Sequence, residues 1–180
     1  MKVSIIVAMD NKRGIGKANR IPWHIKEDLV RLKNLTVGHT VILGRTTYES
    51  MLGYYQKSGK PTMSMRTHIV VTRDPNYHVD EDKGIAANSI GDAIKLAKEK
   101  EAQRQAEGSQ EIFVIGGEKI FQQTIGFADK LYLTIVDDPP TGGFDADTFF
   151  PDYPEFKKVI AKEERDNGEY KYTFLELEKV

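Results

Sequence analysis

Short apolar runs that alternate with amphipathic segments constrain the fold of this chain more than any other feature. The runs cover residues 3–9, 40–43, 68–72, 112–115 and 130–135. Each is too short to span a membrane and has the near-continuous apolar character of a strand covered on both faces. Segments with helical spacing separate them, at residues 25–35, 46–52, 89–107 and 117–125. This alternation predicts an α/β fold with a mainly parallel central sheet.

The C-terminal part departs from this alternation. Residues 156–161 and 170–177 flank the turn signal Asp166-Asn167-Gly168, which predicts an antiparallel hairpin. The segment 99–110 is charged and rich in Gln and Ala, so we expect it to prolong the preceding helix, and 137–143 is expected to be a loop. No repeat or linker interrupts the chain, which predicts a single domain over residues 1–180.

Composition excludes several classes of function. The formal net charge is −1 and no block of Lys or Arg occurs, so we expect no nucleic-acid partner. The chain has no cysteine, and its four histidines lack metal-ligand spacing, so we expect no metal site. The N-terminal run lacks a signal-peptide cleavage pattern, which favours a cytoplasmic protein. With no exposed apolar repeat, a monomer is the default expectation.

One acidic residue lies inside a stripe of apolar positions. Ile25, Leu29, Leu32 and Leu35 follow helical spacing, and Asp28 falls within that stripe. A carboxylate among apolar neighbours must be paired, neutralised or used in function. The alternative is that Asp28 caps the first turn of its helix, where acids are common. The Pro22-Trp23 pair just upstream carries the only tryptophan in the chain.

The ends of three predicted strands carry residues suited to phosphate. In open α/β sheets, ligands bind beyond the carboxyl ends of the strands, where helix N-termini offer free N–H groups. The strand ends are Gly44-Arg45-Thr46-Thr47, Thr72-Arg73 and Ile115-Gly116-Gly117-Glu118-Lys119. Three such junctions predict an extended, phosphate-rich ligand such as a dinucleotide. Each glycine could instead be a plain turn residue, and each arginine a solvated one.

The common nucleotide fingerprints are absent from the sequence. Gly14-Ile15-Gly16-Lys17-Ala18-Asn19 begins like a dinucleotide fingerprint, but Asn19 stands at the third glycine position and the context indicates a loop. No Walker A sequence occurs, so nucleotide hydrolysis lacks its usual residues. The acids near residues 137–147 do not form an EF-hand pattern either.

Taken together, these pieces resemble the dihydrofolate reductase family over residues 3–177. The shared anchors are Ile15-Gly16, Pro22-Trp23 with Asp28-Leu29, the segment 44–50, Val114-Ile115-Gly116-Gly117, Leu131-Tyr132-Leu133-Thr134 and the segment 147–151. The resemblance implies a mostly parallel sheet with an antiparallel C-terminal strand, flanked by about four helices. It also implies hydride transfer from NADPH to C6 of dihydrofolate, with protonation at N5, to give the tetrahydrofolate of one-carbon metabolism.

The resemblance implies roles for residues around the substrate. Asp28 would hold the 2-amino group and N3–H of the pterin, Thr134 would hydrogen-bond this carboxylate, and Trp23 would order water near it. Ile6, Val7 and Ala8 would line the pterin with their backbone. Leu32 and Met51 would contact the aryl portion of the substrate, and Arg66 would bind the α-carboxylate of its glutamate tail.

The resemblance also implies a cofactor site. Its residues would be Ala8, Ile15, Gly16, Gly44, Arg45, Thr46, Thr47, Thr72, Arg73, Ile115, Gly116, Gly117, Glu118, Lys119 and Ile120. Gly116 and Gly117 would be joined by an unusual peptide bond. The segment 10–21 corresponds to a lid over the nicotinamide, and Asp147 would hold that lid, although a solvated loop acid is the alternative.

Three departures from the family pattern bear on these roles. Tyr48 replaces the more usual tryptophan, and Thr46 stands where a basic side chain often helps to bind the 2′-phosphate. The segment 52–65 is longer than typical and lacks the usual Pro-Leu-Pro-Gly run before Arg66. Two alternatives remain at this point: a riboflavin-pathway pyrimidine reductase of the same fold, and a non-catalytic nucleotide- or pterin-binding module.

Overall fold

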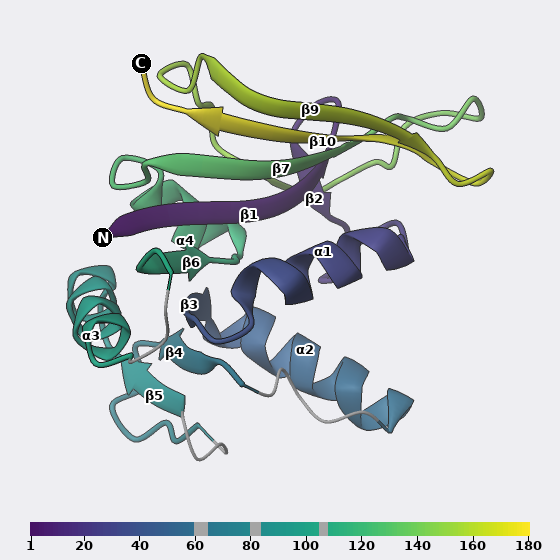
Figure 1. Cartoon of the computed structure of the whole chain (residues 1–180). Helices are drawn as coiled ribbons and strands as arrows, with labels where there is room; N and C mark the ends of the chain where they lie inside the picture. The colour runs from purple at the N-terminus through teal and green to yellow at the C-terminus, as the bar shows by residue number, and fades with distance from the viewer. Residues whose placement is uncertain (60–64, 80–83, 105–107) are drawn as a thin grey trace.

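An eight-stranded sheet forms the centre of the computed structural model, which describes residues 1–59, 65–79, 84–104 and 108–180 (Figure 1). Its strands lie in the order β5-β4-β3-β6-β1-β7-β10-β9. They are β1 (Lys2–Asp10), β3 (Thr40–Gly44), β4 (Thr67–Val71), β5 (Gly84–Ala87), β6 (Glu111–Val114), β7 (Lys130–Val136), β9 (Lys158–Asp166) and β10 (Lys171–Glu178). In this order, each strand from β5 through β4, β3, β6 and β1 to β7 pairs in parallel with the next, whereas β10 is antiparallel to both β7 and β9.

Four helices of the described residues cover the sheet: α1 (Lys26–Thr36), α2 (Arg45–Ser58), α3 (Ile90–Ala102) and α4 (Glu118–Thr124). Alternate residues of each strand face opposite sides, so one strand feeds two cores. In β3, Ile42 packs in the cluster that contains Ala93 and Ala97 of α3, whereas its neighbour Leu43 packs with Met51 of α2. The parallel strands are therefore buried on both faces, as their unbroken apolar runs predict.

The predicted strands and helices are confirmed, with some different boundaries. Helix α2 extends to Ser58, because Gly59 in the left-handed region ends it there. Helix α3 ends at Ala102, short of the predicted 107, and residues 105–107 lie outside the described part. The hairpin strand β9 begins at Lys158, two residues later than predicted, and continues to the turn at Asp166.

Three short strands were not predicted. Strand β5 is the parallel edge next to β4, and β2 (Gly14–Gly16) pairs antiparallel with β8 (Thr148–Phe149) in a separate two-stranded sheet. The expectation of a loop at residues 14–16 is therefore wrong. A Cβ atom on Gly16 would lie 2.6 Å from Thr148 Oγ1, so glycine there permits the close pairing of β2 and β8.

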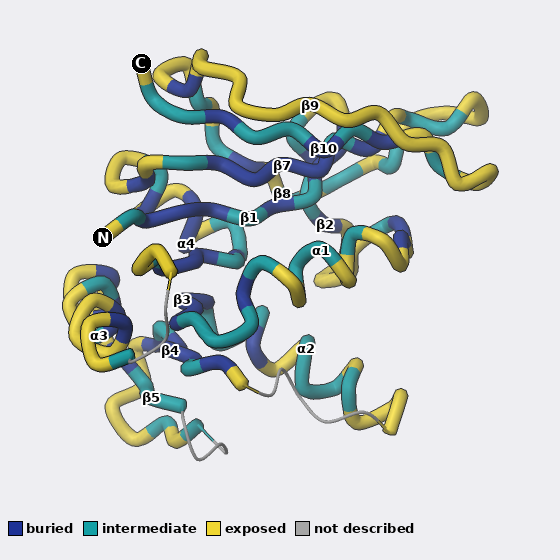
Figure 2. Tube along the Cα trace, viewed as in Figure 1, coloured by how far each residue is buried: buried dark blue, intermediate teal, exposed yellow. Residues whose placement is uncertain are grey.

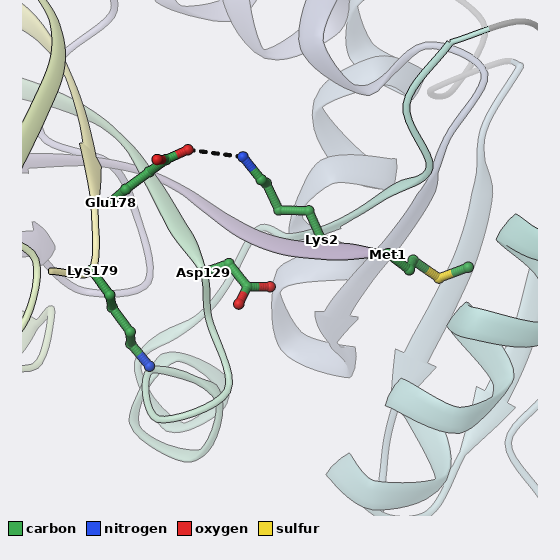
Figure 3. Close-up of a pocket in the computed structure, with 5 residues that line it drawn as sticks. All are labelled: Met1, Lys2, Asp129, Glu178 and Lys179. Atoms are coloured by element: carbon green, nitrogen blue, oxygen red, sulfur yellow. Dashed lines mark hydrogen bonds and ion pairs between the residues drawn. The ribbon is translucent and has the colours of Figure 1, made fainter.

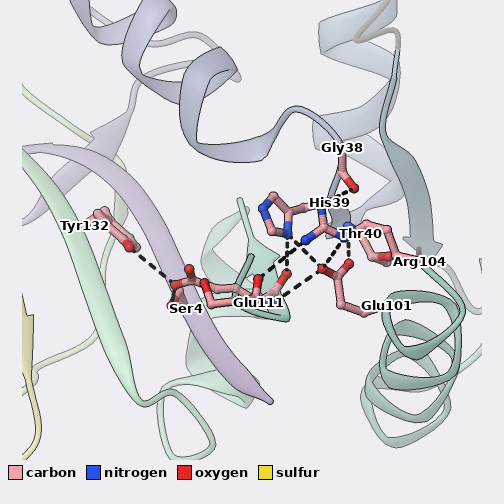
Figure 4. A network of polar contacts seen from close by, with 9 residues as sticks. Ser4, Gly38, His39, Thr40, Glu101, Arg104, Glu111 and Tyr132 are labelled. Carbon is pink, nitrogen blue, oxygen red and sulfur yellow. Dashed lines mark hydrogen bonds and ion pairs between the residues drawn. The ribbon is translucent and has the colours of Figure 1, made fainter. Parts of the chain in front are cut away.

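A polar network closes the edge of the sheet where the parallel strands begin (Figure 4). The Glu101 side chain of α3 is fully buried and accepts a hydrogen bond of 3.1 Å from the backbone N–H of Thr40. Its carboxylate also lies 2.8 Å from His39 Nδ1 and 3.1 Å from Arg104 Nε. These bonds fasten α3 to the start of β3. The opposite end of the sheet, where the parallel strands end, remains for ligands.

Strand β9 is exposed along its whole length (Figure 2). It pairs only with β10, and its sequence changes from Val159 and Ile160 to a charged run ending at Asp166. Charges on an edge strand discourage pairing with another chain. In the described residues, no helix is long and apolar enough to cross a membrane.

Candidate active site

Asp28 bonds to the neighbouring sheet instead of capping its own helix. Helix α1 has Ile25 as its N-cap and no side-chain cap hydrogen bond. Thr134 Oγ1 of β7 donates a hydrogen bond of 2.6 Å to Asp28 Oδ1, across 106 positions of sequence. The capping alternative is therefore not supported, and the carboxylate lies where α1 meets the central strands.

The strand register brings several expected residues to this carboxylate. Ala8 of β1 lies opposite Thr134 of β7, so the end of β1 forms the adjoining wall. Trp23 is buried and packs edge-on against Phe144, with ring centroids 4.9 Å apart. The indole N–H of Trp23 is buried and has no acceptor among the described residues.

The two adjacent acids of α1 have opposite electrostatic environments. Burial raises the pKa of Asp28, and the bond from Thr134 and the charge of Arg31 only partly offset this effect. Glu27 Oε2 accepts a hydrogen bond of 2.7 Å from the hydroxyl of Tyr172, and this bond is the main cause that lowers the pKa of Glu27. Arg165 also donates to Glu27, at 2.9 Å. Asp28, a desolvated acid, thus lies beside Glu27, which forms an ordinary ion pair with Arg165.

Arg31 is a charged neighbour of Asp28 that the sequence reasoning missed. It follows Asp28 by three residues on α1, and its side chain is 16% exposed. The spacing alone could have identified it, because residues three apart on a helix are neighbours. Its Nη1 donates to the carbonyl oxygen of Leu133 at 3.3 Å, directly before Thr134 on β7.

The apolar stripe of α1 is only partly buried. Ile25 is 2% exposed, whereas Leu29 is 38% exposed. Leu32 and Met51 are half-buried. Helices α1 and α2 therefore present apolar side chains that protein does not fully cover.

Arg66 comes directly before β4 and is 5% exposed. Its Nε donates a hydrogen bond of 2.7 Å to Thr36 Oγ1 at the end of α1. The hydroxyl of Thr36 in turn donates to the carbonyl oxygen of Leu32 at 2.7 Å. A buried guanidinium is thus fixed between the end of α1 and the start of β4.

Glycine residues bring the ends of β3 and β6 into close contact. The N–H of Gly44 donates to the carbonyl oxygen of Gly116 at 2.8 Å, and Gly116 and Gly117 are joined by a cis peptide bond, as the expected unusual peptide. A Cβ atom on Gly117 would lie 3.2 Å from Thr47 Oγ1, and one on Gly44 would lie 3.2 Å from Ile120 Cγ1. Glycine therefore permits the close approach of backbone where α2 and α4 begin, and helix starts of this kind offer free N–H groups to a phosphate.

Arg45, the first residue of α2, is held by acids. Its Nε donates to Glu49 Oε1 at 2.9 Å, and its Nη1 donates to Asp74 Oδ2 at 3.3 Å. The guanidinium also lies over the ring of Tyr77, 4.3 Å from the centroid. Thr46 and Arg73 are exposed, and Thr72 is buried. The sequence did not predict that two carboxylates, Glu49 and Asp74, both bind Arg45, the residue expected to bind the cofactor.

The segment predicted to be a lid is bound to the loop before β8. Asp147 Oδ2 accepts a hydrogen bond of 2.9 Å from the N–H of Ala18, and Asp145 Oδ2 lies 2.9 Å from Lys17 Nζ. Glu118 Oε1 of α4 accepts a hydrogen bond of 2.9 Å from the N–H of Phe149. The Glu118 side chain therefore braces the loop, while Ile15 and Gly16 lie on β2.

A second hollow, lined by Met1, Lys2, Asp129, Glu178 and Lys179, lies at the start of β1 (Figure 3). Its acids already have protein partners: Lys2 Nζ donates to Glu178 Oε1 at 2.8 Å, and Asp129 Oδ2 accepts from the N–H of Val3 at 2.9 Å. It is not a candidate site. Within the described residues, no cluster of three or more His, Asp or Glu side chains could hold a metal ion.

The fold is that of an α/β enzyme, with a desolvated carboxylate on α1 and closely packed glycines at the ends of β3 and β6. A family model described as dihydrofolate reductase matches residues 2–179. The chain is 34% identical to a dihydrofolate reductase of Staphylococcus haemolyticus, covering 100% of this chain and 97% of that protein. It is 35% identical to one of Bacillus subtilis, covering 98% and 94%. The chain therefore belongs to the dihydrofolate reductase family.

A solved structure supports the same assignment. Dihydrofolate reductase from Enterococcus faecalis, complexed with NADP(H) and RAB-propyl, superposes with a TM-score of 0.77 at 26% identity, covering 99% of this chain and 96% of that one. The fold expected from the sequence is confirmed. The pyrimidine reductase and the non-catalytic binding module are not favoured.

Proposed function

We propose that the Asp28 pocket binds dihydrofolate and that the glycine cradle binds NADPH. The chain is an NADPH-dependent dihydrofolate reductase that forms tetrahydrofolate for one-carbon metabolism. The observation that carries the residue assignment is the bond between Asp28 and Thr134, because it aims a desolvated carboxylate away from its own helix.

Asp28 has the chemistry to recognise a pterin. Its Oδ1 accepts from Thr134, which leaves Oδ2 and the remaining lone pairs for the 2-amino group and N3–H of the substrate. Two parallel charge-assisted bonds fix both orientation and register. Ile6, Val7 and Ala8 would line the ring along β1.

The raised pKa of Asp28 favours a role in protonation. A carboxyl group with a raised pKa keeps its proton to a higher pH than a free aspartate does. Trp23, whose buried indole N–H has no acceptor among the described residues, would order the water that connects the carboxyl group to N5. Thr134 would hold the carboxyl group in place through the transfer.

The rest of the substrate would lie between α1 and α2. Leu32 and Met51 are half-buried and would contact the aryl portion. Arg66, buried and oriented by Thr36, would bind the α-carboxylate of the glutamate tail. The exposed face of Leu29 would lose water to the same ligand.

The residues of the cradle fit a dinucleotide. Gly44, Gly116 and Gly117 pack so closely that an added Cβ atom would lie against Ile120, Phe121 and Thr47 respectively, so only glycine lets the ends of β3 and β6 approach α2 and α4 in this way. When bound, NADPH supplies the hydride that adds to C6 of the pterin. Its pyrophosphate would be held by the helix starts and by Thr46, Thr47, Ile115 and Lys119, with Glu118 bracing the adjacent loop. Its adenosine end would be held by Arg45, Thr72 and Arg73. Its nicotinamide would lie against Ala8, Ile15 and Gly16.

Asp147 would hold the segment 10–21 in the arrangement seen here, through the N–H of Ala18. A segment closed over the reacting rings excludes water and so strengthens every polar contact within the pocket. We further propose that the chain acts as a single domain of residues 1–180, as a monomer in the cytoplasm and without nucleic acid. Gel filtration measures the monomer directly.

The test is the loss of NADPH absorbance when dihydrofolate is added to the purified chain, with NADH run in parallel. We expect oxidation that requires both substrates, with a higher kcat/KM for NADPH. The matched control is the Asp28→Asn variant, which leaves Arg31 and the segment 10–21 unchanged. It should bind NADPH and reduce dihydrofolate slowly. Folded protein that binds NADPH but does not oxidise it would contradict the proposal.

A further inference from the structure

Arg31 is held rigidly beside the pocket although no role described above uses it. Its Nη2 lies 3.5 Å from Glu176 Oε1 of β10, and its guanidinium carbon lies 4.6 Å from the centroid of the Phe174 ring. It also lies 5.8 Å from the Tyr132 ring. A guanidinium that stacks on aromatic rings and donates to a carbonyl cannot turn toward solvent without losing both contacts.

These contacts join α1 to β7 at two successive residues. Asp28 accepts from Thr134, and Arg31 donates to the carbonyl oxygen of Leu133. The two ties are three residues apart on the helix and adjacent on the strand, so together they fix both the position and the rotation of α1 relative to β7.

We propose that Arg31 is a positioning residue for the reaction: it fixes α1 against β7 beside Thr134 and holds a fixed positive charge next to the Asp28 carboxylate. This inference rests on the proposed function of Asp28 and adds a residue to it. Arg31 acts through Asp28 and makes no contact of its own with the reacting atoms.

Two charged or titratable groups interact electrostatically with Asp28: Arg31 on α1 and Tyr172 on β10. Arg31 interacts in turn with Glu176 and Tyr132, and Tyr172 with Glu27 and Arg165. Burial, with the bond to Glu27, raises the pKa of Tyr172 to about 12, so this phenol is neutral. Glu27 is paired with Arg165 at 2.9 Å, and Glu176 is shared between Arg31 and Lys130, the latter at 2.7 Å. Among these groups, Arg31 is the cation that opposes the effect of burial on Asp28.

Two substitutions change the charge around Asp28 in opposite directions. Arg31→Met keeps an unbranched stem over the Phe174 ring but removes the cation, so the pKa of Asp28 should rise by about 1. Glu176→Gln removes the carboxylate paired with Arg31, so the pKa of Asp28 should fall by about half as much. Arg31→Lys retains the charge and should keep the pKa of Asp28 close to that of the wild-type protein.

The experiment is a ¹³C NMR titration of the Asp28 carboxyl group in the full chain, assigned by its absence in Asp28→Asn. The same variants are then compared in the pH profile of kcat/KM. Opposite displacements in Arg31→Met and Glu176→Gln support the inference. An unchanged Asp28 titration in folded Arg31→Met overturns it.

If Arg31→Met does not fold, Glu176→Gln decides: a lower pKa of Asp28 supports the inference, and an unchanged or higher pKa overturns it. A displaced titration with an unmoved pH profile would instead contradict the proposed function of Asp28 and leave the electrostatic effect of Arg31 standing. The two failures are thus distinguishable.

Discussion

Replacing Asp28 with Asn tests the site by exchanging one carboxylate oxygen for an NH₂ group, with almost no change of volume. The amide oxygen can still accept from Thr134 at the position of Oδ1, so α1 should stay in place. The other end becomes an NH₂ donor facing the donors of the pterin. Two charge-assisted hydrogen bonds are lost, each worth about 1.5–3 kcal/mol. The expected loss in kcat/KM is therefore about 10²- to 10⁴-fold.

The same substitution should stabilise the fold at neutral pH. Burial raises the pKa of Asp28 above its value in the unfolded chain, about 3.9. The stability due to that proton is fully present below the unfolded pKa and is lost as the pH rises through the folded pKa. Wild-type protein at pH about 7 therefore carries a desolvated carboxylate that the amide avoids.

Three measurements separate these effects: initial rates with saturating NADPH, quenching of the single tryptophan by NADPH, and urea unfolding at several pH values. We expect lower kcat/KM, unchanged NADPH affinity, and a higher unfolding midpoint that returns to the wild-type value in acid. Undiminished kcat/KM across pH, or a variant less stable than wild type at neutral pH, would refute the reasoning.

Further substitutions test the other parts of the site. Arg66→Ala should raise KM for dihydrofolate about ten- to hundredfold through the loss of a charged hydrogen bond, with NADPH affinity nearly unchanged in a fluorescence titration; a selective loss of NADPH binding would place Arg66 in the other site. Asp74→Asn frees Arg45 from an exposed carboxylate, so NADPH affinity should rise about two- to fivefold while NADH affinity stays constant, and equal changes for both cofactors would argue for a merely structural role. Asp147→Ala removes the acceptor for Ala18 and should lower kcat about three- to tenfold with an unchanged urea midpoint, whereas Asp147→Asn, which keeps an acceptor oxygen, should lose less.

Elements with strong local signals were predictable from the sequence. The apolar runs of β1, β3, β4, β6 and β7 are nearly continuous, and the Asp166-Asn167-Gly168 turn fixes the hairpin. Strands β2, β5 and β8 have two to four residues and little apolar character, so only their pairing partners define them. Their existence depends on tertiary contacts that no local pattern contains.

The site divides in the same way. Asp28 could be singled out because it interrupts a helical pattern, and the glycines because they end strands. The exposure of Leu29 and the pairing of Arg45 with Asp74 were not predictable, since both depend on how distant elements come together. Periodicity indicates which side of a helix is apolar, but not whether protein or a ligand covers it.

The central place of β1 has a consequence during synthesis. This strand leaves the ribosome well before its partners on both sides, β6 and β7, which begin only at Glu111 and Lys130. An apolar strand must therefore wait, unpaired, for most of the chain to be made. The nascent protein is most exposed to aggregation in that interval, and helices α1 to α3 can form locally while β1 is still without a neighbour.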